Sequence, residues 1–271
     1  MKRNAVIDMT HGPLLGKILL FSLPLMASNI LQLLFNAADI VVVGRFAGSA
    51  SLAAVSSTVS VISLFTQLLI GLSVGINVVI ARYLGLGGQG KEISRTLHTA
   101  VLVAMIGGVA LGAVGILSSD WVLDLTGVPD DVRPLALLYM RIYFIGTPFT
   151  MLYNYGAAAL RAAGDTRRPL FFLMVSGMVN VVLNLISVIV LHMDVKGVAL
   201  ATVISQAVSA VLVLLCLSQT MGDLHFSWSQ LCLDKHRLLD MAHVGIPAGI
   251  QSCLFSLSNV VIQGAINSFG S

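Results

Sequence analysis

The sequence predicts an all-α membrane protein, a polytopic bundle of transmembrane helices. Of its 271 residues, 57% are hydrophobic and only 10% are charged, and the mean hydropathy is +0.94. Soluble domains carry about 25% charged residues, so the composition excludes an ordinary cytosolic globule. A spanning helix needs roughly 20 apolar residues. The chain contains seven runs of that kind, and it lacks the ten-residue alternation that is typical of membrane barrels.

The expected spans are 14–43, 51–81, 97–118, 135–160, 169–192, 197–219 and 244–268. The first follows Lys2 and Arg3, as a signal peptide would, but Pro24 interrupts it and six spans follow. We therefore expect a retained first helix. The longest connection, 220–243, contains Trp228 and forms either a short interfacial helix or a solvated linker.

The distribution of basic residues predicts that the N-terminus is cytoplasmic, because inner loops are enriched in Lys and Arg. With that orientation, eleven basic residues lie inside and four lie outside, while the outer loop 119–134 is acidic. We expect a multi-pass protein of the plasma membrane. The charge of +3 then reflects topology, and no basic face predicts nucleic-acid binding.

Asp39 is the only acid within the long apolar segments. Asn29, Gln32, Asn36 and Asp39 are spaced by three and four, which places them on one helix face. Charges in hydrocarbon are costly, so intramembrane acids mostly mark ion or proton paths. The alternative is an interfacial acid paired with Arg45. We favour the functional interpretation because the apolar run continues beyond Asp39.

Polar residues at helical spacing also occur in the other spans, where hydrogen bonding between helices is the simplest explanation. Hydrogen bonding between helices does not require two amides one turn apart, as at Asn180 and Asn184. Such a pair can offer carbonyl oxygens to a cation. The other candidates for lining a polar cavity are Tyr139, Tyr143, Gln206 and Asn259.

A weak internal repeat relates the first and last spans. Pro24 aligns with Pro247 and Asn36 with Asn259, and six intervening spans give both copies the same orientation. The sequence therefore predicts a six-helix lobe over 1–222, followed over 223–271 by an inner loop and the first helix of an incomplete second lobe. Alternating access needs two lobes, so we expect the 271-residue chain alone not to transport.

One loop motif is more specific than these patterns. In the stretch LRAAGDTRRPL (160–170), Asp165 and Thr166 can cap the following helix and Pro169 fits its first turn. With Gly164 and Arg167, this loop resembles the corresponding loop of the MATE (multidrug and toxic compound extrusion) family. The stretches PLMASN, DIVVVGR, GVALAT and GIPAGIQ are also similar to that family.

The resemblance implies one half of a V-shaped pair of six-helix lobes. It implies export of cationic and amphipathic drugs in exchange for Na⁺ or H⁺, and a coupling-ion site at Asp39, Asn180, Asn184 and Thr202. Many relatives with this site have an acid where Asn184 stands, so we expect a lower site charge and weaker cation binding here. The expected partners are membrane lipid, small organic substrates, the coupling cation and a C-terminal lobe.

Two alternatives remain open. One is a lipid-linked polysaccharide flippase of the wider superfamily, which favours arginines in a central cavity. The other is a truncated chain without transport activity. The sequence contains no HExxH, GxSxG or Walker A motif, and we expect neither an enzyme nor a cofactor. Three cysteines without paired spacing predict no disulfide and no CxxC metal site.

Overall fold

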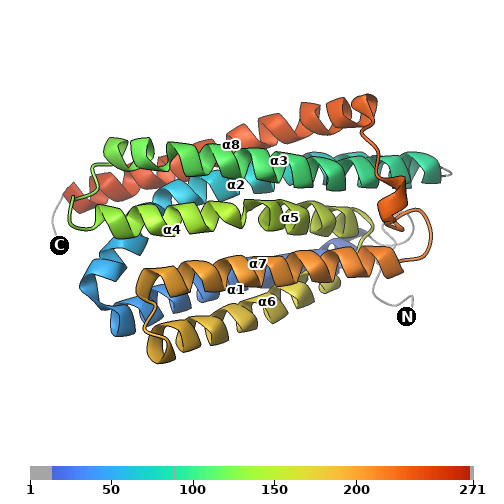
Figure 1. The fold of residues 1–271 in the computed structure, drawn as a ribbon. Helices are drawn as coiled ribbons and strands as arrows, with labels where there is room; N and C mark the ends of the chain where they lie inside the picture. The colour runs from blue at the N-terminus through green and yellow to red at the C-terminus, as the bar shows by residue number, and fades with distance from the viewer. Residues whose placement is uncertain (1–13, 88, 269–271) are drawn as a thin grey trace.

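The computed structural model describes residues 14–87 and 89–268, with side chains over 15–258 except residues 60 and 88, and every element in this part is helical. In chain order the elements are α1 (Leu14–Val42), η2 (Val43–Ala47), α2 (Gly48–Leu86), α3 (Gly90–Leu125), α4 (Arg133–Ile145), α5 (Thr147–Ala162), α6 (Arg167–Leu185), η3 (Ile186–Val190), α7 (Asp194–Gln219), η4 (Trp228–Gln230) and α8 (Lys235–Ser268). The long helices lie side by side in one elongated bundle (Figure 1). The predicted all-α fold is confirmed.

Five helical runs of the described residues are long and apolar enough to span a membrane, and the bent pair of α4 and α5 makes a sixth. The run Leu15–Leu86 has 72 residues. As one straight helix it would extend about 108 Å, against a hydrocarbon core of about 30 Å. It turns instead at η2, and α1 and α2 cross the molecule in opposite directions (Figure 1). With this run divided at η2 and the bent pair taken together, the described helices correspond to the seven predicted segments.

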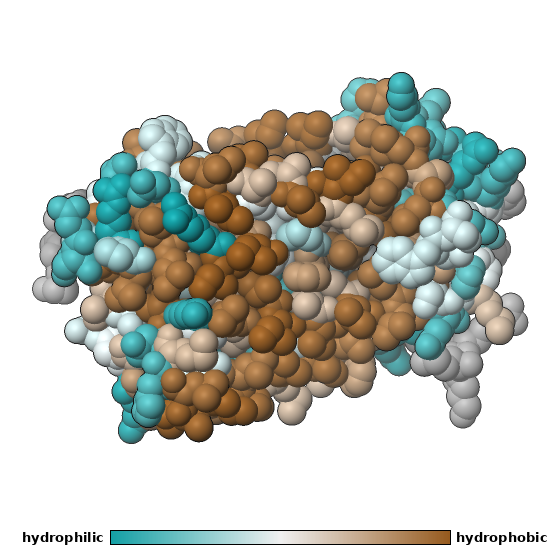
Figure 2. Space-filling model, viewed as in Figure 1, coloured by the Kyte–Doolittle hydropathy of each residue, from teal (hydrophilic) through white to brown (hydrophobic). Residues whose placement is uncertain are grey.

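The surface is apolar where lipid is expected. Large hydrophobic side chains are exposed on several helices, including Leu33 on α1, Leu117 on α3 and Met178 on α6. Figure 2 shows apolar residues along the middle of the visible face and hydrophilic ones gathered at its two ends. Such a broad exposed apolar surface is unusual for a soluble protein, and its placement matches a bundle that lies across a bilayer.

The predicted span 135–160 is not one straight helix. It is divided into α4 and α5, which are bent by 45°. Pro148 lies in the first turn of α5 and has no N–H to donate, so the helical hydrogen-bond ladder is interrupted there. Gly146 at the bend packs against α7, where a Cβ on Gly146 would lie 2.5 Å from Oε1 of Gln206. The bend therefore brings α4 and α5 close to a polar residue of α7.

Two glycine pairs bring α2 and α8 into close contact. A Cβ on Gly71 would lie 2.3 Å from Cα of Gly249, and one on Gly75 would lie 2.1 Å from the carbonyl oxygen of Met241. Gly245, one turn before Gly249, packs on the backbone of α2 in the same way. Small residues four apart let helix backbones approach in lipid.

The described part of the last predicted span is closely packed, because α8 lies against α2 at these glycines. Within α8, Ser252 Oγ donates to the Ala248 carbonyl of its own helix at 2.9 Å. The side chains of Asn259 and Gln263 lie outside the described residues. The predicted domain boundary at residue 222 stays a prediction.

The connection from α7 to α8 is fixed to the first turns of α3. Nε2 of buried His98 accepts a hydrogen bond from the backbone N–H of Ser227 at 3.0 Å, and the His98 ring stacks on Phe226. Thr99 Oγ1 donates to the Cys232 carbonyl and accepts from the Asp234 N–H. The segment is therefore not a freely solvated linker, and its helical part before α8 is the single turn η4 at Trp228–Gln230. All three cysteines are free thiols.

Candidate functional site

Three helices bring the predicted coupling-ion residues together: α1 carries Asp39, α6 carries Asn180 and Asn184, and α7 carries Thr202. The contact between α1 and α6 sets their register. Gly177 lies under the ring of Phe35, so close that a Cβ on Gly177 would lie 1.9 Å from Cε2 of the ring. Asp39 is one turn beyond Phe35, and Asn184 is two turns beyond Gly177. The aromatic ring on the glycine therefore places the carboxylate beside the amide.

A continuous chain of hydrogen bonds connects the four residues. Nδ2 of Asn184 donates to Oδ1 of Asp39 at 2.5 Å and to Oδ1 of Asn180 at 3.2 Å. Nδ2 of Asn180 lies 3.5 Å from Oγ1 of Thr202, and that hydroxyl donates to the Val198 carbonyl at 3.0 Å. The four residues that the family resemblance singled out thus form one contiguous polar group across three helices.

The burial within this group is graded. Asn184 and Asn180 are 0% and 6% exposed, whereas Asp39 and Thr202 are partly exposed. Asn184 Oδ1 is buried without a hydrogen-bond partner among the described residues. A buried polar atom without a partner is costly and calls for an explanation such as a bound ion.

The donor set of this group is one carboxylate with amide and hydroxyl oxygens. These are hard oxygen ligands of low total charge, which suit an alkali cation or a proton better than a transition metal. Among the described residues there is no group of three or more His, Cys, Asp or Glu side chains that could hold a metal ion. The residues present therefore fit a monovalent cation or a proton.

Three of the predicted cavity residues lie beside this group. Tyr139 is buried close enough to Asp39 to interact with its charge, and its ring stacks on Tyr143. The Tyr143 hydroxyl is 3.0 Å from Oγ1 of Thr66. Oε1 of Gln206 is buried without a partner among the described residues. The polar interior thus continues from α1, α6 and α7 to α4 and α2.

The other cavity candidates are not enclosed. Asn29, Gln32 and Asn36 of α1 are all exposed on the surface of this chain. Exposed amides that continue a helix face toward a carboxylate are unfavourable against lipid. This face therefore requires water or polar protein next to it. The side chain of Asn259 lies outside the described residues.

The motif loop 163–166 has the predicted role only in part. Gly164 has a φ of +83°, which explains the glycine. Asp165 Oδ1 accepts from the Arg168 N–H at 3.1 Å, and its Oδ2 pairs with the Arg168 guanidinium at 3.0 Å. Burial raises the pKa of the Asp165 carboxyl above its usual value, while these contacts oppose the shift. Pro169 lies in the first turn of α6, which begins at Arg167.

The prediction that Thr166 caps α6 is wrong. Its hydroxyl is buried without a hydrogen-bond partner among the described residues. Asp165 satisfies the free N–H group of Arg168 from one position earlier, so the hydroxyl is not needed there. Sequence reasoning also missed Thr66, Phe35 and Gly177. A lone Thr or Gly in an apolar span carries no signal, because its role depends on the helix that it contacts.

The comparisons with known proteins agree with this arrangement. The family model described as MatE matches residues 24–186, which include Asp39, Asn180 and Asn184. The chain belongs to the MATE family. It is 30% identical to the "Probable multidrug resistance protein YoeA" of Bacillus subtilis over 261 residues, which cover 93% of this chain and 56% of that protein.

Other relatives carry different names. The chain is 27% identical to the "FAD transporter" of Shewanella oneidensis, covering 94% of this chain and 58% of that protein. This MATE chain thus spans somewhat more than half the length of the curated relatives it matches.

Solved structures show the same fold. A MATE protein in the bent conformation superposes with a TM-score of 0.80 at 26% identity, covering 93% of this chain and 55% of that one. A MOP-superfamily transporter from Pyrococcus furiosus superposes with a TM-score of 0.82 at 25% identity, covering 90% and 54%. The MATE-type helix bundle predicted from the sequence is confirmed.

Proposed function

We propose that this chain supplies the cation-binding lobe of an antiporter that exports cationic or amphipathic compounds in exchange for Na⁺ or H⁺. The observation that carries the proposal is the hydrogen-bonded group formed by Asp39, Asn184, Asn180 and Thr202. It places one carboxylate among neutral oxygens, with one side held by buried amides. The plasma membrane and a cytoplasmic N-terminus belong to the same proposal, since the basic residues favour them.

The group can exchange one monovalent cation for another. Asp39 is the charged member, and a bound Na⁺ or proton neutralises it in a weakly polar surrounding where a bare carboxylate is unfavourable. Without the cation, the Asn184 N–H group still stabilises the carboxylate by a charge-assisted hydrogen bond. Asn184 therefore lowers the cost of the empty state, which a coupling site must pass through in every cycle.

The exposed polar face of α1 supports the proposed substrate class. Between Asn29 and Asp39 this face carries amides and one acid but no arginine or lysine. Amides tolerate many ligands, and the acid disfavours anions, so the face suits neutral or cationic compounds. Relatives named as multidrug resistance proteins support this assignment. One matched relative is instead named for the transport of FAD. The flippase alternative would favour arginines on this face, and none is present between Asn29 and Asp39.

The direct test is cation binding to the purified 271-residue chain. Thermal unfolding would be followed in detergent with NaCl or choline chloride at matched ionic strength, at several pH values. We expect Na⁺ to raise the midpoint in the wild type and Asp39→Asn to remove that response. Asn180→Ala should weaken it. Ser176→Ala is the matched control, because Ser176 lies one turn earlier on α6 and bonds only the Leu173 carbonyl.

A transport assay completes the test. The same substitutions would be placed in the complete transporter and assayed in vesicles with an imposed Na⁺ or pH gradient. Asp39→Asn should abolish dye export while the amount of protein in the membrane is unchanged. If Asp39→Asn still bound Na⁺ and its thermal midpoint still responded to pH, Asp39 would be only an interfacial acid and the proposal would be contradicted.

A further inference from the structure

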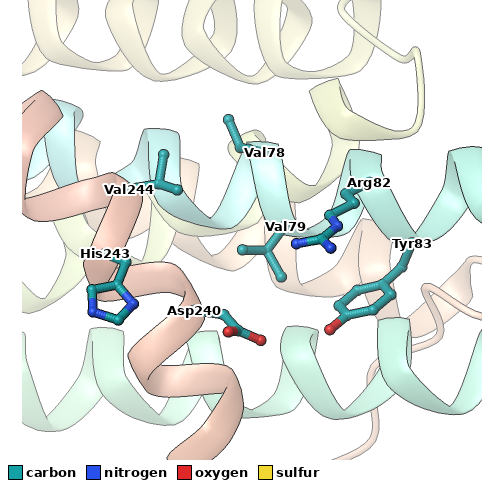
Figure 3. A pocket seen from close by; sticks show the side chains of 7 residues that line it. All are labelled: Val78, Val79, Arg82, Tyr83, Asp240, His243 and Val244. Carbon is teal, nitrogen blue, oxygen red and sulfur yellow. The ribbon is translucent and has the colours of Figure 1, made fainter.

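We propose that a cavity between α2 and α8 binds the zwitterionic headgroup of an aminophospholipid, a phosphoethanolamine group. The cavity has a volume of about 200 Å³ and is lined by Val78, Val79, Arg82, Tyr83, Asp240, His243 and Val244. In Figure 3 the polar ends of Arg82, Tyr83 and Asp240 point toward one another across its centre. This volume exceeds that of a single water several-fold. The site is separate from the Asp39 group, so the inference does not rest on the proposed function.

The two charges in this cavity differ in how far they are already satisfied. Oδ2 of Asp240 accepts from Nη1 of Arg237 at 3.2 Å and lies 3.2 Å from Nδ1 of His236. Both contacts use the same oxygen, and Oδ1 has no hydrogen bond among the described residues. Arg82 is exposed and has no ion pair among the described residues. Within the described part of the chain, the cavity is therefore lined by a guanidinium without an ion pair, that of Arg82, and by a carboxylate oxygen without a hydrogen bond, Oδ1 of Asp240.

The walls of the cavity are held in place by Arg237. Its guanidinium pairs with Glu92 of α3 at 2.5 Å, hydrogen-bonds the Tyr83 hydroxyl and lies 4.9 Å from the centre of the Tyr83 ring. The side chain of Arg237 is only 15% exposed. Tyr83 and Asp240 are thus both held by contacts with Arg237. A cavity whose polar walls are fixed before binding loses little entropy when a ligand enters.

The position of the cavity indicates a lipid. Arg82 lies one turn before the end of α2 at Leu86, and Asp240 lies near the start of α8, so both are at the end of their spans. This end also carries most of the basic residues, which predicts that it faces the cytoplasm. The valines continue from the polar centre toward the apolar part of the bundle. Polar pockets between spans at this depth are suited to lipid headgroups.

The charge pattern selects among headgroups. A phosphate can pair with Arg82, and a primary ammonium can donate to Oδ1 of Asp240. A phosphocholine group satisfies Arg82 equally but has no N–H for the carboxylate. A phosphoglycerol group is anionic and leaves Asp240 without a cation. We therefore expect phosphatidylethanolamine to bind more tightly than phosphatidylcholine or phosphatidylglycerol.

The experiment measures lipid binding to the detergent-solubilised chain by native mass spectrometry, with the shift in thermal midpoint as a second readout. Each of the three lipids would be added with matched acyl chains, and soluble phosphoethanolamine would be added separately at the same concentrations. Arg82→Gln should reduce the affinity for phosphatidylethanolamine about tenfold, as expected for one charge-assisted hydrogen bond. Because Arg82 has no ion pair among the described residues, the variant should fold normally.

Lys91→Gln is the matched control, since Lys91 is an exposed cation at the same end of the molecule and does not line the cavity. It should bind all three lipids as the wild type does. Equal or tighter binding of phosphatidylcholine or phosphatidylglycerol by the wild type would overturn the proposal. So would an unchanged affinity for phosphatidylethanolamine in Arg82→Gln. If soluble phosphoethanolamine bound as tightly as phosphatidylethanolamine, the assignment to a lipid would be overturned.

Discussion

Asn184 of α6 donates a hydrogen bond from Nδ2 to Oδ1 of Asp39 in α1, joining two residues that lie 145 positions apart. Asn184 is 0% exposed, whereas Asp39 is partly exposed. One side of the carboxylate is thus held by a buried amide, while part of the Asp39 side chain stays exposed. The amide also holds Asn180 through the same nitrogen, so it is the central member of the polar group.

Replacing that amide by an acid should strengthen cation binding. We expect Asn184→Asp to raise the affinity for Na⁺ about tenfold, or ~1.4 kcal/mol. A second carboxylate attracts the cation, but repulsion between two adjacent acids offsets part of the gain. The same repulsion should lower the thermal midpoint in choline chloride. Sodium-dependent thermal unfolding measures both effects.

Asn184→Ala provides the comparison for that variant, because it removes the amide without adding a charge. It should weaken Na⁺ binding and leave Asp39 without its hydrogen-bond donor. An Asn184→Asp protein with the same sodium response as Asn184→Ala would show that this position is not in contact with the ion.

Gly177→Ala should disturb the register of α1 against α6. The added methyl group would lie 1.9, 2.2 and 2.4 Å from three atoms of the Phe35 ring, so the ring must leave its place. Overpacking of this kind costs about 1–3 kcal/mol. Gly107→Ala is the control, since its methyl group would meet only Met151 Cε and Sδ, at 3.6 and 3.9 Å. A lower midpoint and a weaker sodium response in Gly177→Ala alone would support this role.

Arg237→Gln should loosen the inner end of α8. It removes the ion pair with Glu92 and the contact with the Tyr83 ring, both largely shielded from water. We expect a loss of about 2 kcal/mol, because Glu92 is left partly buried and unpaired. Arg133→Gln should have a smaller effect, since Arg133 pairs with two acids at an exposed end of the bundle. Equal midpoints for the two variants would contradict this ranking.

The orientation can be tested by cysteine labelling. Gln89 and Asp130 are exposed at opposite ends of α3, in the connections before and after it. In a background with the three native cysteines replaced by serine, an impermeant reagent added to intact cells should label Asp130→Cys but not Gln89→Cys. The reverse result would show that the N-terminus faces outward.

Composition and periodicity were sufficient to predict most of the fold. Apolar runs of roughly 20 residues must become helices in lipid, because only a helix satisfies the whole backbone within one segment. The positions of α1, α2, α3, α6 and α7 follow from this constraint. The division of 135–160 at Gly146 was not predicted. A Gly before Thr-Pro permits a bend but does not require one, and the contact with Gln206 favours it.

The candidate site residues were predicted from the sequence. Asp39 stands out as a lone acid in an apolar run. The loop motif indicated the family, and the family's ion site indicated Asn180, Asn184 and Thr202. Local sequence is enough for this, because the cost of a charge in hydrocarbon is a property of the residue and its neighbours.

Only the tertiary structure determined how these residues meet. The hydrogen bond from Asn184 to Asp39 depends on the register of two helices that are far apart in sequence, and the Phe35 ring on Gly177 sets that register. The packing of α8 on α2 depends in the same way on Gly71 and Gly249 lying opposite each other. The sequence does not show which helix packs against a given glycine. The absence of a side chain matters only where a second helix approaches that position, since dispersion contacts between helices act over a few ångströms.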